Sequence, residues 1–213
     1  MNLDLFESDV HDAQIAPGAM WFHGLALSVE KQLLADVERV VAAAPFRHML
    51  TPGGRRMSVA MTNCGTFGWV TDQSGYRYDS RDPTTGEPWP PMPATFKELA
   101  ATAADRAGFS RFVPDSCLIN RYEPGARLSL HQDKDEHEFD APIVSVSLGL
   151  PAVFLFGGLR RADTPQRLLL KHGDVVVWGG PARLRYHGIH RLEDGRHPVV
   201  GAYRINLTFR KAR

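Results

Sequence analysis

The chain has 213 residues, a formal net charge of +1 and a hydrophobic fraction of 43%. This length fits one large domain that buries its own core, and the near-neutral charge excludes a protein that is basic overall, so any nucleic-acid signal must be local. The two cysteines, Cys64 and Cys117, indicate neither a disulfide framework nor a structural zinc site. The first residues lack a basic and apolar leader, and no later run reaches membrane-spanning length. We therefore expect a cytoplasmic protein that does not associate with a membrane.

The first 44 residues predict a loose arm and a scaffold helix. Met20-Trp21-Phe22 is typical of a short strand at the end of the arm. Ser28 is a candidate N-cap and Pro45 stops the pattern, so the helix is predicted over residues 28–44. Its apolar residues recur at helical spacing: Val29, Leu33, Leu34, Val37, Val40 and Val41.

Residues 45–92 combine turn signals, arginines and aromatic side chains around a strand-like run over residues 57–63. Such a mixture can hold phosphates and stack on bases, but an ordinary polar surface with aromatic residues packed under loops explains it as well. Between positions 45 and 81, five arginines stand against two acidic residues: Arg47, Arg55, Arg56, Arg77 and Arg81 against Asp72 and Asp79. The interleaved aromatic residues are Trp69, Tyr76 and Tyr78.

The remaining residues predict one more helix and then a series of short strands. Pro93 precedes the helix predicted over residues 94–107, and Gly108 ends it. The candidate strands cover residues 117–122, 128–132, 143–150, 152–156, 167–171, 174–178 and 199–209. Short strands at this spacing indicate an antiparallel jelly roll or barrel, with the two helices bracing one face.

His131 and Asp133 stand two residues apart in a strand-like run, where alternate side chains project from the same face. They can therefore bind one ion together, and His187 from a remote strand would complete a set of two histidines and one carboxylate. That donor set leaves coordination positions open and suits non-haem Fe(II) oxygenases. A His-x-Asp pair also arises often by chance, so the pair alone does not establish a metal site.

The last predicted strand has one wholly polar face, which carries Arg204, Asn206, Thr208 and Arg210. Two guanidinium groups on one face suit a doubly anionic small molecule, because each can pair with a carboxylate through two parallel bonds. An exposed edge strand explains the pattern equally well. In a fully extended strand the two arginine Cα atoms lie roughly 20 Å apart, so their side chains would have to lean toward each other.

The strand over residues 117–122 has a similar mixed face, formed by Leu118, Asn120 and Tyr122. An apolar wall with a few placed polar groups is typical of a ligand site. The same Asn and Tyr could instead satisfy backbone groups at the end of a strand. Both interpretations stay open on this stretch alone.

Several motifs stand in order between about residue 20 and Arg210: Thr51-Pro52-Gly53-Gly54, Met57-Ser58-Val59-Ala60-Met61-Thr62-Asn63, Asn120-Arg121-Tyr122, His131-Gln132-Asp133-Lys134-Asp135-Glu136, Gly173-Asp174-Val175-Val176-Val177-Trp178 and Arg204-Ile205-Asn206-Leu207-Thr208-Phe209-Arg210. Together they resemble the AlkB family of Fe(II)/2-oxoglutarate-dependent nucleic-acid dealkylases. The resemblance implies a mainly β fold with flanking helices, a double-stranded β-helix (jelly roll) with an N-terminal nucleotide-recognition lid. It divides the chain into an arm and scaffold helix (1–44), the lid (45–92) and the jelly-roll dioxygenase core (93–213), which form one compact catalytic domain.

The resemblance also implies a reaction. Fe(II), 2-oxoglutarate and O2 would serve the oxidative demethylation of bases such as 1-methyladenine and 3-methylcytosine, with release of formaldehyde, succinate and CO2. The partner would be alkylated DNA, with RNA as a second candidate, and the damaged base would be flipped out of its strand. The enzyme would act as a monomer.

Residue roles carry over by position in the resembling motifs. Iron would be bound by His131, Asp133 and His187. The far carboxylate of 2-oxoglutarate would be held by Asn120, Tyr122 and Arg204, and its metal-chelating end by Asn206 and Arg210. The flipped base would lie between Trp69 and the His131 ring, with Asp135 at its edge and Met61 and Leu118 nearby. The nucleic-acid strand would be contacted by Thr51, Tyr76, Arg127, Gln132 and Arg161.

Some assignments keep a simpler alternative: Asp135 could only cap a turn, and Trp69 could only pack in the core. The lid also departs from the family pattern through Arg55-Arg56 and Arg77, and the segment after the iron ligands departs through His137-Glu138-Phe139. Two rival functions remain at this point. One is an oxygenase of the same fold that acts on a protein side chain or a small molecule, and the other is a jelly-roll module that binds without turnover.

Overall fold

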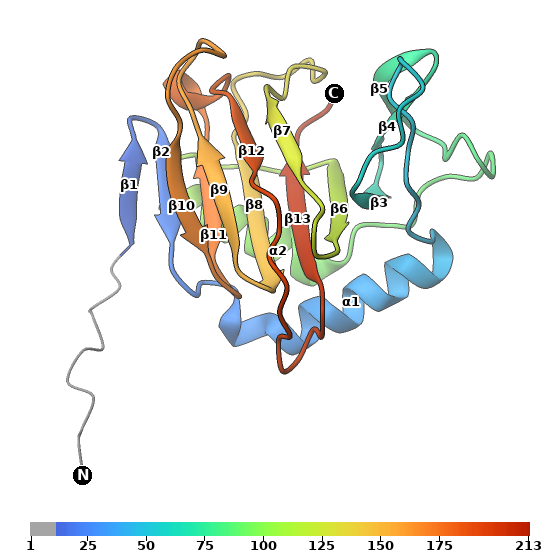
Figure 1. Ribbon diagram of the computed structural model, residues 1–213, viewed down its shortest axis with the longest axis horizontal. Coiled ribbons are helices and arrows are strands. Elements are labelled where there is room, and N and C mark those ends of the chain that lie inside the picture. The colour runs from blue at the N-terminus through green and yellow to red at the C-terminus, as the bar shows by residue number, and fades with distance from the viewer. Residues whose placement is uncertain (1–11) are drawn as a thin grey trace.

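The computed structural model describes residues 12–213, which form two facing β-sheets, a separate hairpin and two flanking helices (Figure 1). The larger sheet has the strand order β1-β2-β11-β8-β13-β6-β3, and the smaller has the order β10-β9-β12-β7. Strands β4 and β5 form the hairpin, and neighbouring strands pair antiparallel throughout. The prediction of a mainly β jelly roll with flanking helices is confirmed.

The bounds of the elements follow the chain. The strands are β1 (Ala13–Ala16), β2 (Ala19–Phe22), β3 (Ala60–Gly65), β4 (Gly68–Asp72), β5 (Gly75–Asp79), β6 (Ser116–Tyr122), β7 (Leu128–His131), β8 (Ile143–Gly149), β9 (Ala152–Phe156), β10 (Gln166–Leu170), β11 (Val175–Trp178), β12 (His187–Ile189) and β13 (Arg204–Arg210). The helices are α1 (Glu30–Ala43) and α2 (Ala94–Arg106), with 3-10 turns η1 (Leu27–Val29) and η2 (Gly180–Ala182).

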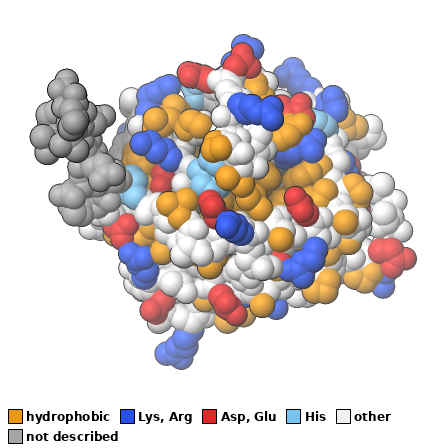
Figure 2. Space-filling view, turned by 90° about the horizontal axis from the view of Figure 1, so that it is seen from below, with side chains coloured by type: hydrophobic (Ala, Val, Ile, Leu, Met, Phe, Trp, Pro, Cys, Tyr) orange, Lys and Arg blue, Asp and Glu red, His pale blue; other side chains and the backbone are white. Residues whose placement is uncertain are grey.

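The surface mixes charges of both signs. Figure 2 shows Lys and Arg side chains interspersed with Asp and Glu on the face seen from below, with hydrophobic side chains between them. Within residues 12–213, every helix is too short or too polar to cross a bilayer.

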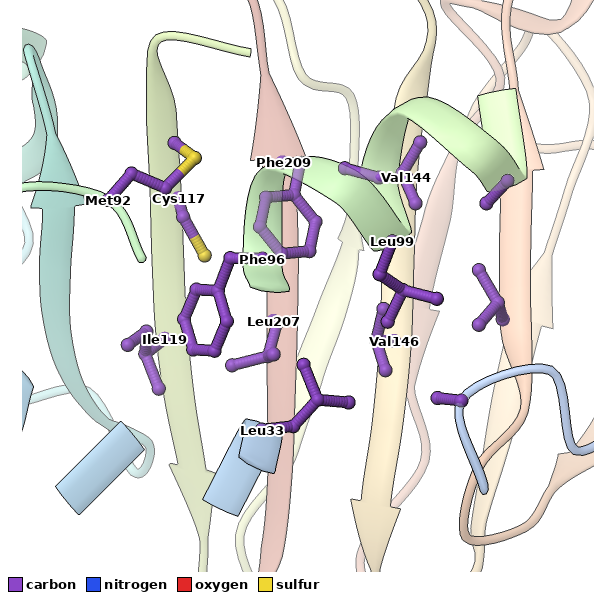
Figure 3. Close-up of a cluster of buried hydrophobic side chains, with 14 of the residues drawn as sticks. Leu33, Met92, Phe96, Leu99, Cys117, Ile119, Val144, Val146, Leu207 and Phe209 are labelled. Atoms are coloured by element: carbon purple, nitrogen blue, oxygen red, sulfur yellow. The ribbon is translucent and has the colours of Figure 1, made fainter. Parts of the chain in front are cut away.

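The helices cover one face of the larger sheet and close the main core. Figure 3 shows Leu33 of α1 and Phe96 and Leu99 of α2 directed at side chains of β6, β8 and β13. The Phe96 ring meets the Phe209 ring edge-on, with centroids 5.8 Å apart. Each such fully buried side chain stabilises the fold by roughly 1.5–3 kcal/mol. This layer therefore fixes the three central strands from behind.

The opposite face of the same central strands is polar and lies between the two sheets. In β13, Leu207 and Phe209 belong to the helix-covered core, whereas Arg204, Asn206 and Arg210 point the other way and are buried. Strand β13 pairs with β8 on one side and β6 on the other. The exposed edge strand that would explain this polar face is thus excluded, and the charged side chains are held in the interior.

Several predicted boundaries are wrong, for local reasons. Ser28 is no N-cap, because the chain enters α1 through the 3-10 turn η1 and Ser28 lies within that turn. The last strand starts at Arg204 rather than at residue 199, because the chain reverses at Gly201, which has a φ of +79° and bridges back to His197. The sequence also left β1, β4 and β5 without a prediction, and it placed His187 on a strand, now β12, without giving bounds for it.

The lid hairpin, β4 and β5, rises beside the edge at which β7 and β13 end (Figure 1). It follows directly after β3, the last strand of the larger sheet. Buried Asn63 of β3 fixes the turn between β3 and β4, since its side chain donates to the carbonyl oxygen of Trp69 and accepts from the Trp69 N–H, both at 3.0 Å. The hairpin is therefore attached at its base, and nearer its tip the Thr71 hydroxyl donates to the Leu50 carbonyl oxygen at 3.1 Å.

Candidate active site

A cavity of about 710 Å³ opens between the sheets and the lid hairpin. Every residue for which a site role is predicted lies on its wall: Thr51, Met61, Trp69, Tyr76, Leu118, Asn120, Tyr122, Arg127, His131, Gln132, Asp133, Asp135, Arg161, His187, Arg204, Asn206 and Arg210. Residues from segments far apart in the chain thus meet around one space, which is large enough for a small co-substrate and a base together.

His131, Asp133 and His187 form the candidate metal centre, with one donor atom of each within 4.8 Å of the others. His131 and His187 are register partners on β7 and β12, with ring centroids 4.4 Å apart. The Asp133 carboxylate reaches both rings: Oδ1 lies 3.6 Å from His131 Nε2 and Oδ2 lies 3.7 Å from His187 Nε2. The three donors face one point, the arrangement of a two-histidine, one-carboxylate facial triad.

The two imidazoles are oriented by their own backbone. The Nδ1–H of His131 donates to the carbonyl oxygen of Ser129 at 2.9 Å, and that of His187 donates to Arg185 at 3.1 Å. Each bond leaves the Nε2 lone pair free for a metal. Burial, together with the neighbouring His131, lowers the pKa of His187 to about 3, so its ring is neutral, as a ligand must be.

Asp133 lies two residues past the end of β7, so the alternation of a strand is not what places it beside His131. Arg210 holds it instead: Nε and Nη2 lie 2.8 and 2.6 Å from Asp133 Oδ2. Burial alone would raise the pKa of Asp133, but Arg210 and the two imidazoles outweigh burial and lower it. Arg183 donates to the Asp133 carbonyl oxygen at 2.8 Å and fixes the backbone of the same residue.

The cavity floor, formed by Asn120, Tyr122, Arg204, Asn206 and Arg210, is buried and cationic. Arg204 is 1% exposed, donates to Ser147 Oγ at 3.0 Å and lies 5.0 Å from the Tyr122 ring centroid. Its Nε and Nη1, like Nη1 of Arg210, have no hydrogen-bond partner within residues 12–213. Buried N–H groups need acceptors. A dicarboxylate such as 2-oxoglutarate would supply them at both arginines, so these residues fit that co-substrate.

Asn206 occupies the middle of the floor and is fixed by neighbours on two strands. Its amide nitrogen donates to Ser145 Oγ at 2.8 Å and to the Val146 carbonyl oxygen at 3.0 Å, while Thr208 donates to its amide oxygen at 2.9 Å. Asn120 also donates to that oxygen, at 3.3 Å. Sequence reasoning assigned no role to Ser145 or Ser147, although polar residues at alternate positions of an apolar strand were the signal for them.

Two adjacent carboxylates join the lid hairpin to the loop that carries the metal ligands. Trp69 and Tyr78 are register partners on β4 and β5. Trp69 Nε1 donates to Asp135 Oδ2 at 2.9 Å, and the Tyr78 hydroxyl donates to Glu136 Oε1 at 2.6 Å. Burial raises the pKa of Tyr78 well above its ordinary value, so the phenol keeps its proton and remains the donor.

Glu136 connects these contacts to the floor, because it also lies 3.3 Å from Arg210 Nε and 3.1 Å from Arg183 Nη2. A chain of contacts therefore runs from the lid through Glu136 and Arg210 to Asp133. Sequence reasoning assigned no site role to Glu136, Arg183 or Tyr78. No local pattern signals an ion pair that is formed between distant segments.

Trp69, a candidate for stacking on the flipped base, has polar and exposed neighbours rather than core packing alone. Trp69 stacks on Tyr76, with centroids 5.7 Å apart and planes 20° apart, and Tyr76 is 50% exposed. Asp135 does more than cap a turn, since it accepts the Trp69 indole N–H. His187 is covered on its far side by Trp178, whose ring centroid lies 4.9 Å away.

Comparison with known proteins agrees with this geometry. A family profile described as the 2OG-Fe(II) oxygenase superfamily matches residues 18–210. The chain is 57% identical to the alpha-ketoglutarate-dependent dioxygenase AlkB of Salmonella typhimurium over 99% of this chain and 98% of that protein. It is 32% identical to mouse nucleic acid dioxygenase ALKBH1 over 58% of this chain and 32% of that protein.

A solved structure titled "The structure of OsALKBH1" superposes with a TM-score of 0.82 at 26% identity, and the match covers 94% of this chain and 100% of that one. Alpha-ketoglutarate is another name for 2-oxoglutarate, the dicarboxylate that the cavity floor fits. The chain therefore belongs to the 2OG-Fe(II) oxygenase superfamily and, within it, to the AlkB family of 2-oxoglutarate-dependent dioxygenases.

Proposed function

We propose that this Fe(II)/2-oxoglutarate-dependent dioxygenase repairs alkylated DNA by oxidative demethylation of its bases, with RNA as a second candidate substrate. One observation carries the proposal. A buried metal triad and a cationic floor share a single cavity with an aromatic lid and a basic rim. The mouse relative named a nucleic acid dioxygenase supports the same class of substrate.

The iron would be held by His131, Asp133 and His187, and 2-oxoglutarate by the floor, with its far carboxylate at Arg204. When bound, iron and 2-oxoglutarate supply the oxidation of a C–H bond by O2. On an N-methylated base that oxidation gives a hemiaminal, which collapses to formaldehyde and the repaired base. The residues of the chain place the target carbon and shield it from water.

The base would enter between Trp69 and His131, with Met61 and Leu118 beside it. In 1-methyladenine and 3-methylcytosine the ring is cationic near neutral pH. The Asp135 carboxylate and the Trp69 face would favour this charge over the neutral parent base. Since Asp135 accepts the Trp69 indole N–H, a base that binds beside Trp69 would exchange or share that acceptor.

The strand outside the cavity would be bound at the rim by Thr51, Tyr76, Arg127, Gln132 and Arg161. Flipping the base costs a few kcal/mol, and a methyl group that already prevents pairing lowers that cost. We keep the division into arm and scaffold helix (1–44), lid (45–92) and core (93–213) as part of this proposal. The proposal also includes a cytoplasmic location and a monomeric state for the enzyme.

Formaldehyde release tests the proposal directly. The protein is incubated with Fe(II), 2-oxoglutarate and O2 and with matched DNA and RNA oligonucleotides that carry one methylated base. We expect formaldehyde and succinate in equal amounts, and none from the unmethylated strand. Succinate without formaldehyde from every oligonucleotide would point to the oxygenase that acts on another substrate, and the absence of both would point to the module that binds without turnover.

A further inference from the structure

The turn between residues 51 and 56 presents two consecutive arginines on a fixed backbone. The Thr51 N–H donates to the Arg55 carbonyl oxygen and the Gly54 N–H donates to that of Thr51, both at 2.8 Å. The Thr51 hydroxyl accepts the Arg55 N–H at 3.2 Å, and a φ of +75° at Gly54 closes the turn. The backbone of this Arg55–Arg56 turn is thus set, while both arginine side chains are exposed on the cavity wall.

The charge of the lid region is concentrated at this turn. Arg47 pairs with Asp82 at 2.6 Å, and Arg77 pairs with Asp72 at 2.9 Å. The excess of arginines in the sequence is therefore neutralised at these positions. Arg55 and Arg56 have no ion pair within residues 12–213, and positions 45–71 contain no acidic residue.

The cavity rim as a whole keeps its cations unpaired. Besides Arg55 and Arg56 it carries Arg127, Lys134 and Arg161, none of which has an ion pair with the described part of the chain. Ser58 joins the turn to Arg127, since its hydroxyl donates to the Arg127 carbonyl oxygen at 2.9 Å and accepts the Arg127 N–H at 3.2 Å.

Away from the rim, several basic side chains are neutralised by an acidic neighbour. Arg106 pairs with Asp12 at 2.5 Å and Arg160 with Asp163 at 3.0 Å, and charges of both signs alternate on the face in Figure 2. Five basic side chains without an ion pair among the described residues gather at the mouth of the cavity, and such a cluster raises the local concentration of anions there.

We propose that the Arg55–Arg56 turn is a binding site for the phosphodiester backbone of the strand next to the flipped base. The inference rests on the proposed function and extends the strand contact proposed for Thr51 to the two arginines of the same turn, to which no role has been assigned. A guanidinium binds phosphate through paired N–H groups, and two adjacent side chains can engage two phosphates. The occupant is single-stranded nucleic acid long enough to reach from the buried base to this turn.

The test compares Arg55→Ala/Arg56→Ala with the unchanged protein, each loaded with Mn(II) and 2-oxoglutarate so that binding is measured without turnover. Affinity for a methylated single-stranded 15-mer is followed by fluorescence anisotropy over a range of salt concentrations. Each lost phosphate contact reduces the slope of log K against log salt by about 0.7 on a single strand, so the double variant should lose about 1.4. A methylated trinucleotide, too short to reach the turn, should release formaldehyde at an unchanged rate.

Two further variants decide between a local site and net charge. Arg167→Ala/Arg196→Ala removes the same charge from exposed positions outside the cavity wall and should leave the slope unchanged. Arg55→Lys/Arg56→Lys keeps the charge and should retain most of the slope. Equal slopes for the unchanged protein and Arg55→Ala/Arg56→Ala overturn the inference, as does an equal loss in both double Ala variants. If the unchanged protein releases no formaldehyde from any methylated oligonucleotide, the proposed function itself fails.

Discussion

The cavity floor and the lid hairpin face each other across the same space but are held by opposite means. Floor side chains such as Arg204 and Asn206 extend from central strands of the larger sheet, are buried and have fixed hydrogen-bond partners. The lid hairpin is attached at its base through Asn63, and beyond that its polar contacts to the loop of the metal ligands are those of Trp69 and Tyr78. The groups proposed to hold the metal and the small anion thus have buried hydrogen-bond partners, whereas Trp69, proposed to contact the base, extends from a hairpin outside the two main sheets.

The largest effect on activity is expected at the candidate metal centre. His131→Ala removes one donor of the triad, so formaldehyde release should fall by at least roughly a thousandfold, because the metal contribution of several kcal/mol is lost. His190→Ala is the matched control, since His190 is exposed and outside the cavity wall. Full activity of His131→Ala would show that the metal centre has been misplaced.

The next largest effect is expected at Arg204, where the far carboxylate of 2-oxoglutarate is proposed to bind. Arg204→Ala removes the buried guanidinium whose Nε and Nη1 are open. The KM for 2-oxoglutarate should rise by about one to two orders of magnitude, since a hydrogen bond to a charged group contributes about 1.5–3 kcal/mol. The rate at saturating 2-oxoglutarate should change less. Arg204→Lys keeps the charge without the paired N–H groups, so its KM should lie between those of the unchanged protein and Arg204→Ala. An unchanged KM in Arg204→Ala would show that 2-oxoglutarate does not bind at Arg204.

On the lid side the expected effect is smaller and falls on the base. Trp69→Ala should weaken binding of a methylated oligonucleotide about tenfold, because a stacked base contributes about 1–3 kcal/mol. Binding of 2-oxoglutarate should stay the same, since Trp69 lies on the lid. Trp69→Phe keeps a ring and loses the bond to Asp135, so it separates stacking from the hydrogen bond. Equal affinity in all three proteins would remove the stacking role.

The last expected effect, no larger than that of Trp69→Ala, is on lid motion. Tyr78→Phe deletes the phenol that donates to Glu136 and leaves Glu136 with its two arginines. Amide hydrogen exchange in residues 68–79 should become about tenfold faster, because one hydrogen bond to a charged group is lost. Tyr203→Phe is the control, since its hydroxyl has no hydrogen bond among the described residues. Unchanged exchange in Tyr78→Phe would mean that the Tyr78–Glu136 contact does not restrain the lid.

The sequence predicted the chemistry of the floor better than its position in the fold. The alternation of polar and apolar residues in β13 identified the face that carries Arg204 and Arg210, and the resemblance assigned it to 2-oxoglutarate. Whether that face was exposed could not be decided, because burial depends on pairing with β8 and β6, which no local pattern specifies. Likewise, Asp133 was assigned as a metal ligand, but Arg210, rather than strand geometry, orients it.

The lid was predicted less well because its contacts join distant segments. Tyr78 and Glu136 lie 58 positions apart, and nothing near either residue signals their hydrogen bond. The composition of the lid suggests that Arg47 and Arg77 make it basic, but in the fold both are paired with acidic residues. The two lid strands were missed because they are short and polar residues interrupt their alternation.

The central claim is that the triad and the cationic floor bind Fe(II) and 2-oxoglutarate together in this cavity. Adding Fe(II) and 2-oxoglutarate under anaerobic conditions tests it without any nucleic acid. We expect a metal-to-ligand charge-transfer band in the visible spectrum, present in the unchanged protein and in His190→Ala and lost in His131→Ala. A spectrum without that band in the unchanged protein, at saturating iron and 2-oxoglutarate, would contradict the account.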